Sequence, residues 1–211
     1  MTHDKAKLRA SYQSFRELTW KLATSKPETL GSYALAIESK TWSLEQSYLA
    51  ALRSISAVES VLGEMDPRKM SDVYRHAIMD FESYLFFFGA LLDIIAKVVP
   101  FFYGKHARKI PRRYFEGQRK WFTDKCPSFD QKYSSFLKEN AGIFDRLDKH
   151  RNKAIHESVS LVGFGTDNVP SLMYFGSDLR EDNVKTFLSE SFEALFRLLQ
   201  YYVDNFGDAK K

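Results

Sequence analysis

Three residues on one short stretch, Arg151, Asn152 and His156, have the side chains that metal-free cleavage of a phosphodiester requires. Arg151 is a permanent cation whose fork of N–H donors matches the oxygens of a phosphate, and Asn152 adds a neutral amide beside it. His156 carries an imidazole, whose ordinary pKa of about 6.5 lets it take or give a proton near neutral pH. We therefore expect Arg151 to stabilise charge on a reacting phosphate, Asn152 to orient it, and His156 to transfer protons.

Helical periodicity places Arg151 on the apolar face of its own helix. It lies four residues from both Leu147 and Ile155, a spacing that puts all three on one side of an α-helix. An unpaired buried charge costs much free energy, so the guanidinium must be paired or face an interface. Asn152 and His156, also four residues apart, form a polar strip beside it. We interpret the stretch as half of a site that a second surface completes.

A purely structural interpretation also fits these residues. Arg151 would then pair with an acidic residue of the preceding apolar helix, Asp80, Glu82 or Asp93, and His156 would lie near the negative end of a helix dipole. Asp80 and Glu82 are not expected to bind a metal ion, because no histidine or further carboxylate follows at ligand spacing. Both interpretations place Arg151 against another surface.

The pattern Arg-Asn-x-x-x-His near the end of a late helix resembles the signature of the HEPN superfamily. In that family an Arg and a His are separated by a few residues, and a polar residue such as Asn often follows the Arg. The matching residues are Arg151, Asn152 and His156, and the resemblance covers residues 66–206. Many members are metal-independent endoribonucleases that act as homodimers with one composite site, whereas others have lost activity and serve as binding or assembly modules.

The resemblance implies an endoribonuclease that cleaves RNA by attack of the 2′-OH and releases a 2′,3′-cyclic phosphate and a 5′-OH. Its catalytic residues would be Arg151, Asn152 and His156, with no cofactor and no metal ion. It also implies a homodimer with a composite site, and toxin–antitoxin or phage-defence systems with an antitoxin-like protein partner. Some subfamilies carry a Tyr two residues after the His that a partner enzyme modifies; Ser158 stands there in this chain, which argues against such regulation.

The sequence leaves two other functions open. One is a non-catalytic HEPN-like module that binds RNA, a nucleotide or a partner protein through the same residues. The other is a structural helical protein in which the Arg/His pattern is incidental. A nuclease of this type needs Arg151 and His156 of both chains in one cleft, so the symmetry of a dimer separates it from the structural protein. Cleavage of RNA separates it from the binding module.

Residues 101–125 are strongly basic and rich in aromatic residues. They carry eight Lys or Arg against two acidic residues, a net charge of +6, which exceeds the +4 of the whole chain. Cations that meet phosphates and rings that stack on bases suit single-stranded RNA. The cations expected to bind RNA are Lys105, Arg108, Lys109, Arg112, Arg113, Arg119 and Lys120. The alternative is a solvated connector whose rings pack inward, these being Tyr103, Tyr114, Phe115, Trp121 and Phe122.

The elements that must position these residues are helices nearly throughout. Apolar spacing and proline positions predict helices over about 4–25, 28–64 (with a break near 39–43), 67–99, 128–158 and 179–206, with a connector or short helix at 105–125. Residues 159–176 flank a turn-rich centre, Thr166-Asp167-Asn168, which predicts a small β-hairpin. Ser177-Asp178 is the predicted cap of the last helix.

The expected fold is a single all-α domain over residues 1–211. We predict an antiparallel up-and-down helical bundle, because the helices are joined by short connections, with the hairpin near 159–176 as an insertion. Residues 1–64 lie outside the resemblance, and residues 66–206 form the HEPN-like core.

Composition favours an ordered, water-soluble protein. The chain is 44% hydrophobic, and Cys126 is its only cysteine, so no intrachain disulfide forms. The N-terminus lacks the apolar run of a signal peptide. Residues 84–103 are apolar enough to suggest a membrane span, but Asp93 and Lys97 fall inside it and would be costly there, and Pro100 ends it. We therefore expect a buried core helix, with Asp93 and Lys97 paired along it, in a cytoplasmic protein.

Overall fold

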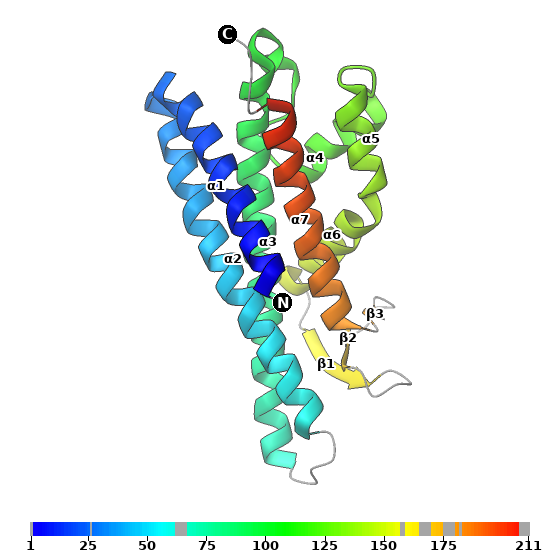
Figure 1. The fold of residues 1–211 in the computed structure, drawn as a ribbon. Helices are drawn as coiled ribbons and strands as arrows, with labels where there is room; N and C mark the ends of the chain where they lie inside the picture. The colour runs from blue at the N-terminus through cyan, green and yellow to red at the C-terminus, as the bar shows by residue number, and fades with distance from the viewer. Residues whose placement is uncertain are drawn as a thin grey trace. The chain divides into compact units, whose positions relative to one another are not determined.

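Helices dominate the protein (Figure 1). The computed structural model describes residues 2–25, 27–61, 67–156, 159–164, 170–174, 180–181 and 183–206. The α-helices of this part of the chain are α1 (Thr2–Ser25), α2 (Pro27–Val61), α3 (Pro67–Val98), α4 (Phe115–Lys120), α5 (Gln131–Glu139), α6 (Ala141–His156) and α7 (Val184–Phe206). Shorter helical segments are η1 (Val99–Lys109) and η2 (Trp121–Lys125). The helical class that the sequence predicts is confirmed.

The first three helices begin and end close to their predicted limits. Pro67 opens α3, as expected of a proline in a first helical turn. The predicted break near 39–43 is wrong, because α2 continues through these residues. Its buried face explains why: Ile37, Thr41 and Leu44 follow one another at helical spacing, and all three are buried.

The predicted helix over 128–158 is wrong as a single element, because the chain forms α5 and α6 with Asn140 between them. Asn140 leaves helical geometry, with φ −101° and ψ 8°. Its side-chain Nδ2 donates to the carbonyl oxygen of Phe136 at 2.8 Å, which satisfies a carbonyl at the end of α5. At the other end, Asp130 caps α5 by accepting a hydrogen bond from the N–H of Tyr133 at 2.9 Å. The candidate residues therefore belong to α6, which begins afresh at Ala141.

The last helix begins later than predicted. Asn183 caps α7, since its Oδ1 accepts a hydrogen bond from the N–H of Thr186 at 2.9 Å. Residues Arg180–Glu181, predicted to be helical, form strand β3. The cap predicted at Ser177-Asp178 lies outside the described residues.

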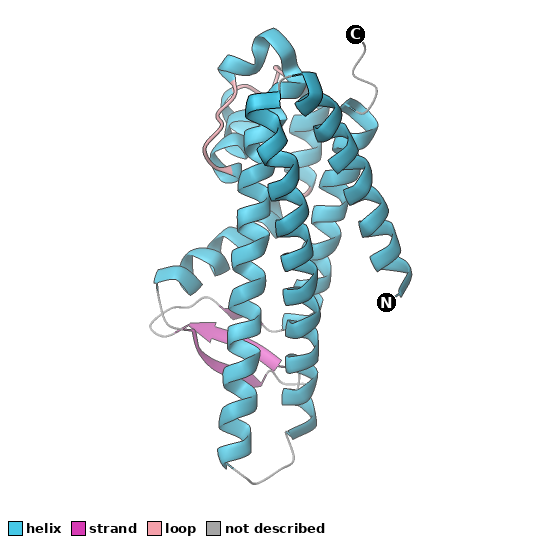
Figure 2. Ribbon diagram, turned by 90° about the vertical axis from the view of Figure 1, so that its left-hand side faces the viewer, coloured by secondary structure: helices cyan, strands magenta, loops and turns pink. Residues whose placement is uncertain are grey.

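A small sheet joins α6 to α7 in the sequence and is drawn in magenta in Figure 2. Its strands are β1 (Val159–Phe164), β2 (Pro170–Tyr174) and β3, in the order β1-β2-β3. The pairing of β1 with β2 is antiparallel, with Val162 opposite Leu172, and β2 pairs antiparallel with β3. The turn predicted at Thr166-Asp167-Asn168 lies outside the described residues, so the hairpin stays a prediction.

The chain divides into two compact units. Unit 1 comprises residues 1–41, 90–143 and 192–211, and unit 2 comprises residues 42–89 and 144–191. The boundaries fall inside α2, α3, α6 and α7, and each unit includes residues from both sides of the predicted limit at 64–66.

Unit 1 has an aromatic core that joins its helical segments. The rings of Phe102 and Phe206 stack with centroids 5.0 Å apart, and Tyr133 packs edge-on against Phe122 at 4.7 Å. At the surface of the same unit, Arg16 of α1 forms an ion pair with Glu38 of α2 at 2.7 Å. Ring packing therefore holds η1, η2, α5 and the end of α7 together.

Unit 2 packs part of α3 against α2, α6 and α7. Tyr84 lies near the ring of Tyr48, and Ser54 donates a hydrogen bond to Asp80. As residue number falls along α2 it rises along α3, so these two segments run antiparallel. The hydroxyl of Tyr84 also lies 2.6 Å from Ser191 Oγ of α7. These contacts join α3 to α2 and to α7 within unit 2.

The apolar segment Ser71–Lys109 is long and apolar enough to cross a membrane by length and composition alone. Within it, 56% of the most apolar window is buried inside the protein. Core helices of water-soluble proteins meet the same two criteria. Inside this segment Asp93 accepts a hydrogen bond from the N–H of Phe115 at 3.0 Å, a partner that the sequence did not indicate.

Candidate functional site

Arg151 lies on the part of α6 that belongs to unit 2, and its side chain is partly buried. Leu147 and Phe144, one and two turns earlier, are both buried, so this face of α6 points into the protein. The helical spacing predicted that Arg151 shares the buried face. The structure agrees for Arg151 and Leu147, whereas the side chain of Ile155 lies outside the described residues.

The surface that receives Arg151 is the backbone of α3 at Gly89. A Cβ atom at position 89 would lie 2.5 Å from Nε, 2.6 Å from Cδ and 2.7 Å from Cζ of Arg151. The guanidinium end of the side chain therefore lies directly on the Cα of Gly89. The apolar-face position of Arg151, which suggested an interface between chains, is explained by this contact within one chain.

Asn152 occupies the neighbouring position and faces solvent. Its Nδ2 donates to Oδ2 of Asp148, one turn earlier, at 3.2 Å. His156 is the last residue of α6, and its side chain lies outside the described residues. The structure thus places a partly buried cation next to an exposed amide, with the backbone of the predicted imidazole one turn beyond.

The three acidic residues predicted as alternative partners of Arg151 have different surroundings. Asp80 accepts a hydrogen bond from Ser54, and Asp93 accepts one from the backbone of Phe115. Partial burial raises the pKa of Glu82 above its ordinary value, so that carboxyl resists ionisation more than an exposed one. The hydrogen bonds described for Asp80 and Asp93 are thus made with partners other than Arg151.

His150, beside Arg151, was missed by the sequence interpretation. It is 1% exposed, and its ring lies 4.9 Å from that of Phe187 on α7 and 6.2 Å, edge-on, from that of Phe81 on α3. Spacing could have found it, because His150 follows Leu147 by three positions and shares the buried face. Its role is to pack α6 between two other helices, which fixes the rotation of α6 and hence the direction in which Arg151 points.

Arg146 strengthens the same packing. Its guanidinium carbon lies 5.0 Å from the ring centre of Phe187, and its Nη1 pairs with Glu190 at 2.8 Å. Both contacts join α6 to α7 within unit 2. Arg151 is thus carried by a helix that is held on two sides.

The basic segment predicted to bind RNA belongs to unit 1. Six of its seven candidate cations are exposed, and five of these lie outside the ion pairs of Glu116, namely Lys105, Arg108, Lys109, Arg112 and Arg113. Gly104, just before them, has φ +51°, a value that glycine adopts without strain, and it bends η1 at that point. The bend separates the buried start of η1 from its exposed basic end.

Arg119 and Lys120 both pair with Glu116, and Arg119 is buried as well. Arg119 is 6% exposed, and its Nε and Nη2 donate to the two carboxylate oxygens of Glu116 at 2.7 and 2.8 Å. Lys120 lies 3.1 Å from the same carboxylate. One acidic residue thus partly neutralises both cations, and burial keeps Arg119 from a phosphate.

The rings of the basic segment mostly point inward, which supports the alternative interpretation for them. Phe115 and Phe122 are buried, and Tyr103 donates a hydrogen bond to Asp130 at 2.8 Å. Tyr114 is the exception, with 51% exposure and the guanidinium of Arg113 5.0 Å from its ring centre. Tyr114 is therefore the exposed ring of this segment, within the residues that the structure describes, and it can stack on a base.

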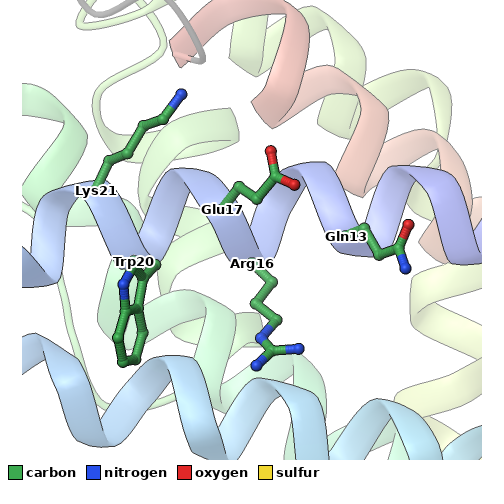
Figure 3. Close-up of a pocket in the computed structure, with 5 residues that line it drawn as sticks. All are labelled: Gln13, Arg16, Glu17, Trp20 and Lys21. Carbon is green, nitrogen blue, oxygen red and sulfur yellow. The ribbon is translucent and has the colours of Figure 1, made fainter.

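A separate hollow of about 510 Å³ lies along α1 in unit 1 (Figure 3). Arg16 and Trp20 point to the same side of α1 in this view, the side on which Arg16 meets Glu38. Its described lining residues are Gln13, Arg16, Glu17, Trp20 and Lys21, none of which belongs to the predicted site. The cation of Arg16 is paired with Glu38, whereas the second cation of the lining, Lys21, is exposed.

Within the part of the chain that the structure describes, no group of three or more His, Cys, Asp or Glu side chains is arranged to hold a metal ion.

No protein-family model matches the chain, no curated protein is similar to it at a significant level, and no solved structure matches its fold.

Proposed function

We propose that this chain is a metal-independent endoribonuclease of the HEPN type. The observation that carries the proposal is the placement of Arg151, whose guanidinium end is held on α3 while Asn152 beside it faces solvent. A cation held in place next to an accessible amide is preorganised to bind one phosphate group of a chain. His156, on the same helix, supplies the proton carrier.

The proposed reaction needs no group beyond RNA and these side chains. The imidazole of His156 removes the proton from a ribose 2′-OH, and the 2′-oxygen attacks the adjacent phosphorus. The bond from phosphorus to the 5′-oxygen breaks, and a second imidazole protonates that oxygen. Arg151 stabilises the negative charge on the phosphorane-like transition state. The products are a 2′,3′-cyclic phosphate and a 5′-OH.

A homodimer supplies the second imidazole in this proposal. Met79 and Phe86 of α3 are 61% and 55% exposed and lie seven residues apart, so they share one face of the helix. Phe86 is one turn from Gly89, on which Arg151 rests. An apolar face so near the candidate site fits a contact that brings two copies of the site together.

We propose that five exposed cations of the basic segment attract the RNA backbone, namely Lys105, Arg108, Lys109, Arg112 and Arg113. Single-stranded RNA carries a negative charge at every phosphate, so five exposed cations raise its local concentration even without base recognition. Tyr114 adds a ring on which one base can stack. We further propose a cytoplasmic protein, folded as an antiparallel bundle with a β-hairpin insertion, that acts in a toxin–antitoxin or phage-defence system with an antitoxin-like partner.

Cleavage of single-stranded RNA in the presence of EDTA tests the function. The wild-type protein is expected to cut, and Arg151→Ala and His156→Ala are each expected to lower the rate at least about 100-fold, as loss of a general acid–base or charge-stabilising group does. Trp20→Ala, in the hollow on α1, is the matched control and should leave the rate unchanged.

The other candidate functions are outcomes of the same experiment. If wild-type protein binds RNA without cutting it, and Arg151→Ala weakens the binding, the chain is a non-catalytic binding module. If the protein does not cut RNA and binds neither RNA nor a nucleotide, the Arg/His pattern is incidental and the chain is a structural helical protein.

A further inference from the structure

Gly89 is an unusual residue for its place in the fold. It lies in the interior of α3 and is buried. Glycine is the least favourable residue after proline in a helix interior, because it loses the most backbone freedom on folding. Gly104 is the described glycine with positive φ, so Gly89 is not required by its backbone conformation. The reason for a glycine must be sought in what lies against it.

The side chain that lies nearest to it is that of Arg151. The three atoms nearest to a Cβ at position 89 are Nε, Cδ and Cζ of Arg151, at 2.5, 2.6 and 2.7 Å. Carbon atoms in van der Waals contact are about 3.5–4.0 Å apart, so even the methyl group of alanine does not fit while Arg151 stays in place. A glycine is the residue that lets a guanidinium lie on the α3 backbone.

We propose that Gly89 is a positioning residue for Arg151, and that the absence of a side chain there sets where the guanidinium stands in the site. This inference rests on the proposed function for its consequence in catalysis, but the packing relation itself does not. The atoms that would have to move are the far end of a long, flexible side chain. A side chain at position 89 therefore displaces Arg151 and leaves the backbones of α3 and α6 in place.

Other helical glycines of the chain lack this relation and provide controls. A Cβ at Gly31 of α2 or at Gly142 of α6 would meet nothing within 4 Å. Gly31→Ala thus gains helix propensity without a clash, and it is the matched control for Gly89→Ala.

Thermal unfolding tests the packing relation without reference to activity. Four proteins are compared: wild type, Gly89→Ala, Arg151→Ala and the double variant. In the Arg151→Ala background, Gly89→Ala should raise Tm by about 2 °C or more, as Gly31→Ala should in the wild type. In the wild-type background the gain should be absent or reversed. An equal rise in both backgrounds would overturn the proposal.

RNA cleavage then tests the consequence. Gly89→Ala should lower kcat at least about 10-fold with little change in KM, because a charge that acts on the transition state is misplaced while the fold persists. The double variant should be no slower than Arg151→Ala alone, and Gly31→Ala should match wild type. Wild-type kcat in Gly89→Ala would contradict the positioning role. If wild-type protein cuts no RNA, the proposed function fails, and the thermal cycle still decides whether Gly89 holds Arg151.

Discussion

Arg119 and Arg113 lie six residues apart in the basic segment, and their surroundings give them different roles. Arg119 is buried and makes a two-point contact with Glu116, the geometry in which a guanidinium and a carboxylate match best. Arg113 is exposed and rests near the ring of Tyr114. The first cation stabilises the fold locally, and the second is accessible to a phosphate.

Substitution of these two residues should therefore have opposite effects. Arg119→Ala should lower the free energy of unfolding by about 3 kcal/mol, because it leaves the half-buried carboxylate of Glu116 without its main partner. It should change RNA affinity little once the fold is restored by lower temperature. Denaturant titration and RNA binding on the same preparation measure the two effects.

Arg113→Ala is the matched comparison. It should leave the free energy of unfolding unchanged within about 0.5 kcal/mol, as exposed substitutions do. It should reduce the slope of log affinity against log salt by about 0.7 for each phosphate that the variant no longer neutralises. An unchanged salt slope would mean that the exposed cations do not meet RNA.

Individual residues also show where prediction from the sequence stops. Helical spacing placed Arg151 on the buried face of α6, and the structure agrees. Spacing identifies a face, but it carries no information on which residue of a distant helix will meet that face. The contact with Gly89 depends on packing between α3 and α6 and was not predictable. The burial of Arg119 was missed for the same reason, although Glu116 three positions earlier was a visible signal.

α3 presents two faces of different character. One is buried in unit 2 and includes Phe81, Tyr84 and Phe88. The other carries Met79 and Phe86, both more than half exposed. A helix that is apolar on its outer face as well is expected to meet another surface, and we propose a second copy of the chain.

Charge on this outer face should disrupt the dimer. Met79→Asp and Phe86→Asp should each weaken self-association at least about 10-fold, because an aspartate must lose its hydration to enter an apolar contact. Sedimentation equilibrium measures the change. Leu35→Asp, a similar substitution at an exposed position of α2 in unit 1, is the control and should associate as wild type does. A dimer that tolerates both α3 variants would place the contact elsewhere.

Element boundaries were predictable where the sequence itself carries the stop signal. Pro67 marks the start of α3, and the first three helices follow the predicted limits closely. Asn140 ends α5, because its side chain bonds to a backbone carbonyl oxygen of the helix. The spacing of apolar residues gives no sign of this bond. The strand at Arg180–Glu181 depends on pairing with β2, a contact that the two residues do not reveal by themselves.

At the scale of the whole molecule, the core of unit 1 contains hydroxyl groups as well as aromatic rings. Unit 1 contains a group of tyrosines, of which Tyr133 and Tyr202 share a hydrogen bond and Tyr103 donates one to Asp130. Burial is the main cause that raises the pKa of all three above the ordinary 10.0. Their hydroxyl groups therefore stay protonated in the folded chain at pH values where exposed phenols ionise.

Stability should fall in alkaline solution as a result. Above about pH 10 the unfolded chain loses phenolic protons that the folded chain retains, so each further pH unit costs about 1.4 kcal/mol per retained proton. Below that pH these tyrosines contribute no pH dependence. Urea titrations from pH 8 to pH 11, with tyrosinate absorbance recorded alongside, measure the fall. Tyr103→Phe should make it shallower, and a flat profile up to pH 11 would contradict the burial of these hydroxyls.

The chemical nature of the RNA ends shows whether the 2′-oxygen is the nucleophile. Purified protein is incubated in EDTA with a single-stranded RNA and with a matched oligonucleotide that carries 2′-deoxyribose at the cleaved position. The proposed chemistry requires the 2′-oxygen as nucleophile, so the RNA should yield 2′,3′-cyclic phosphate and 5′-OH ends, the deoxy substrate should remain intact, and His156→Ala should be inactive. Cleavage of both substrates, or 5′-phosphate ends, would contradict the account.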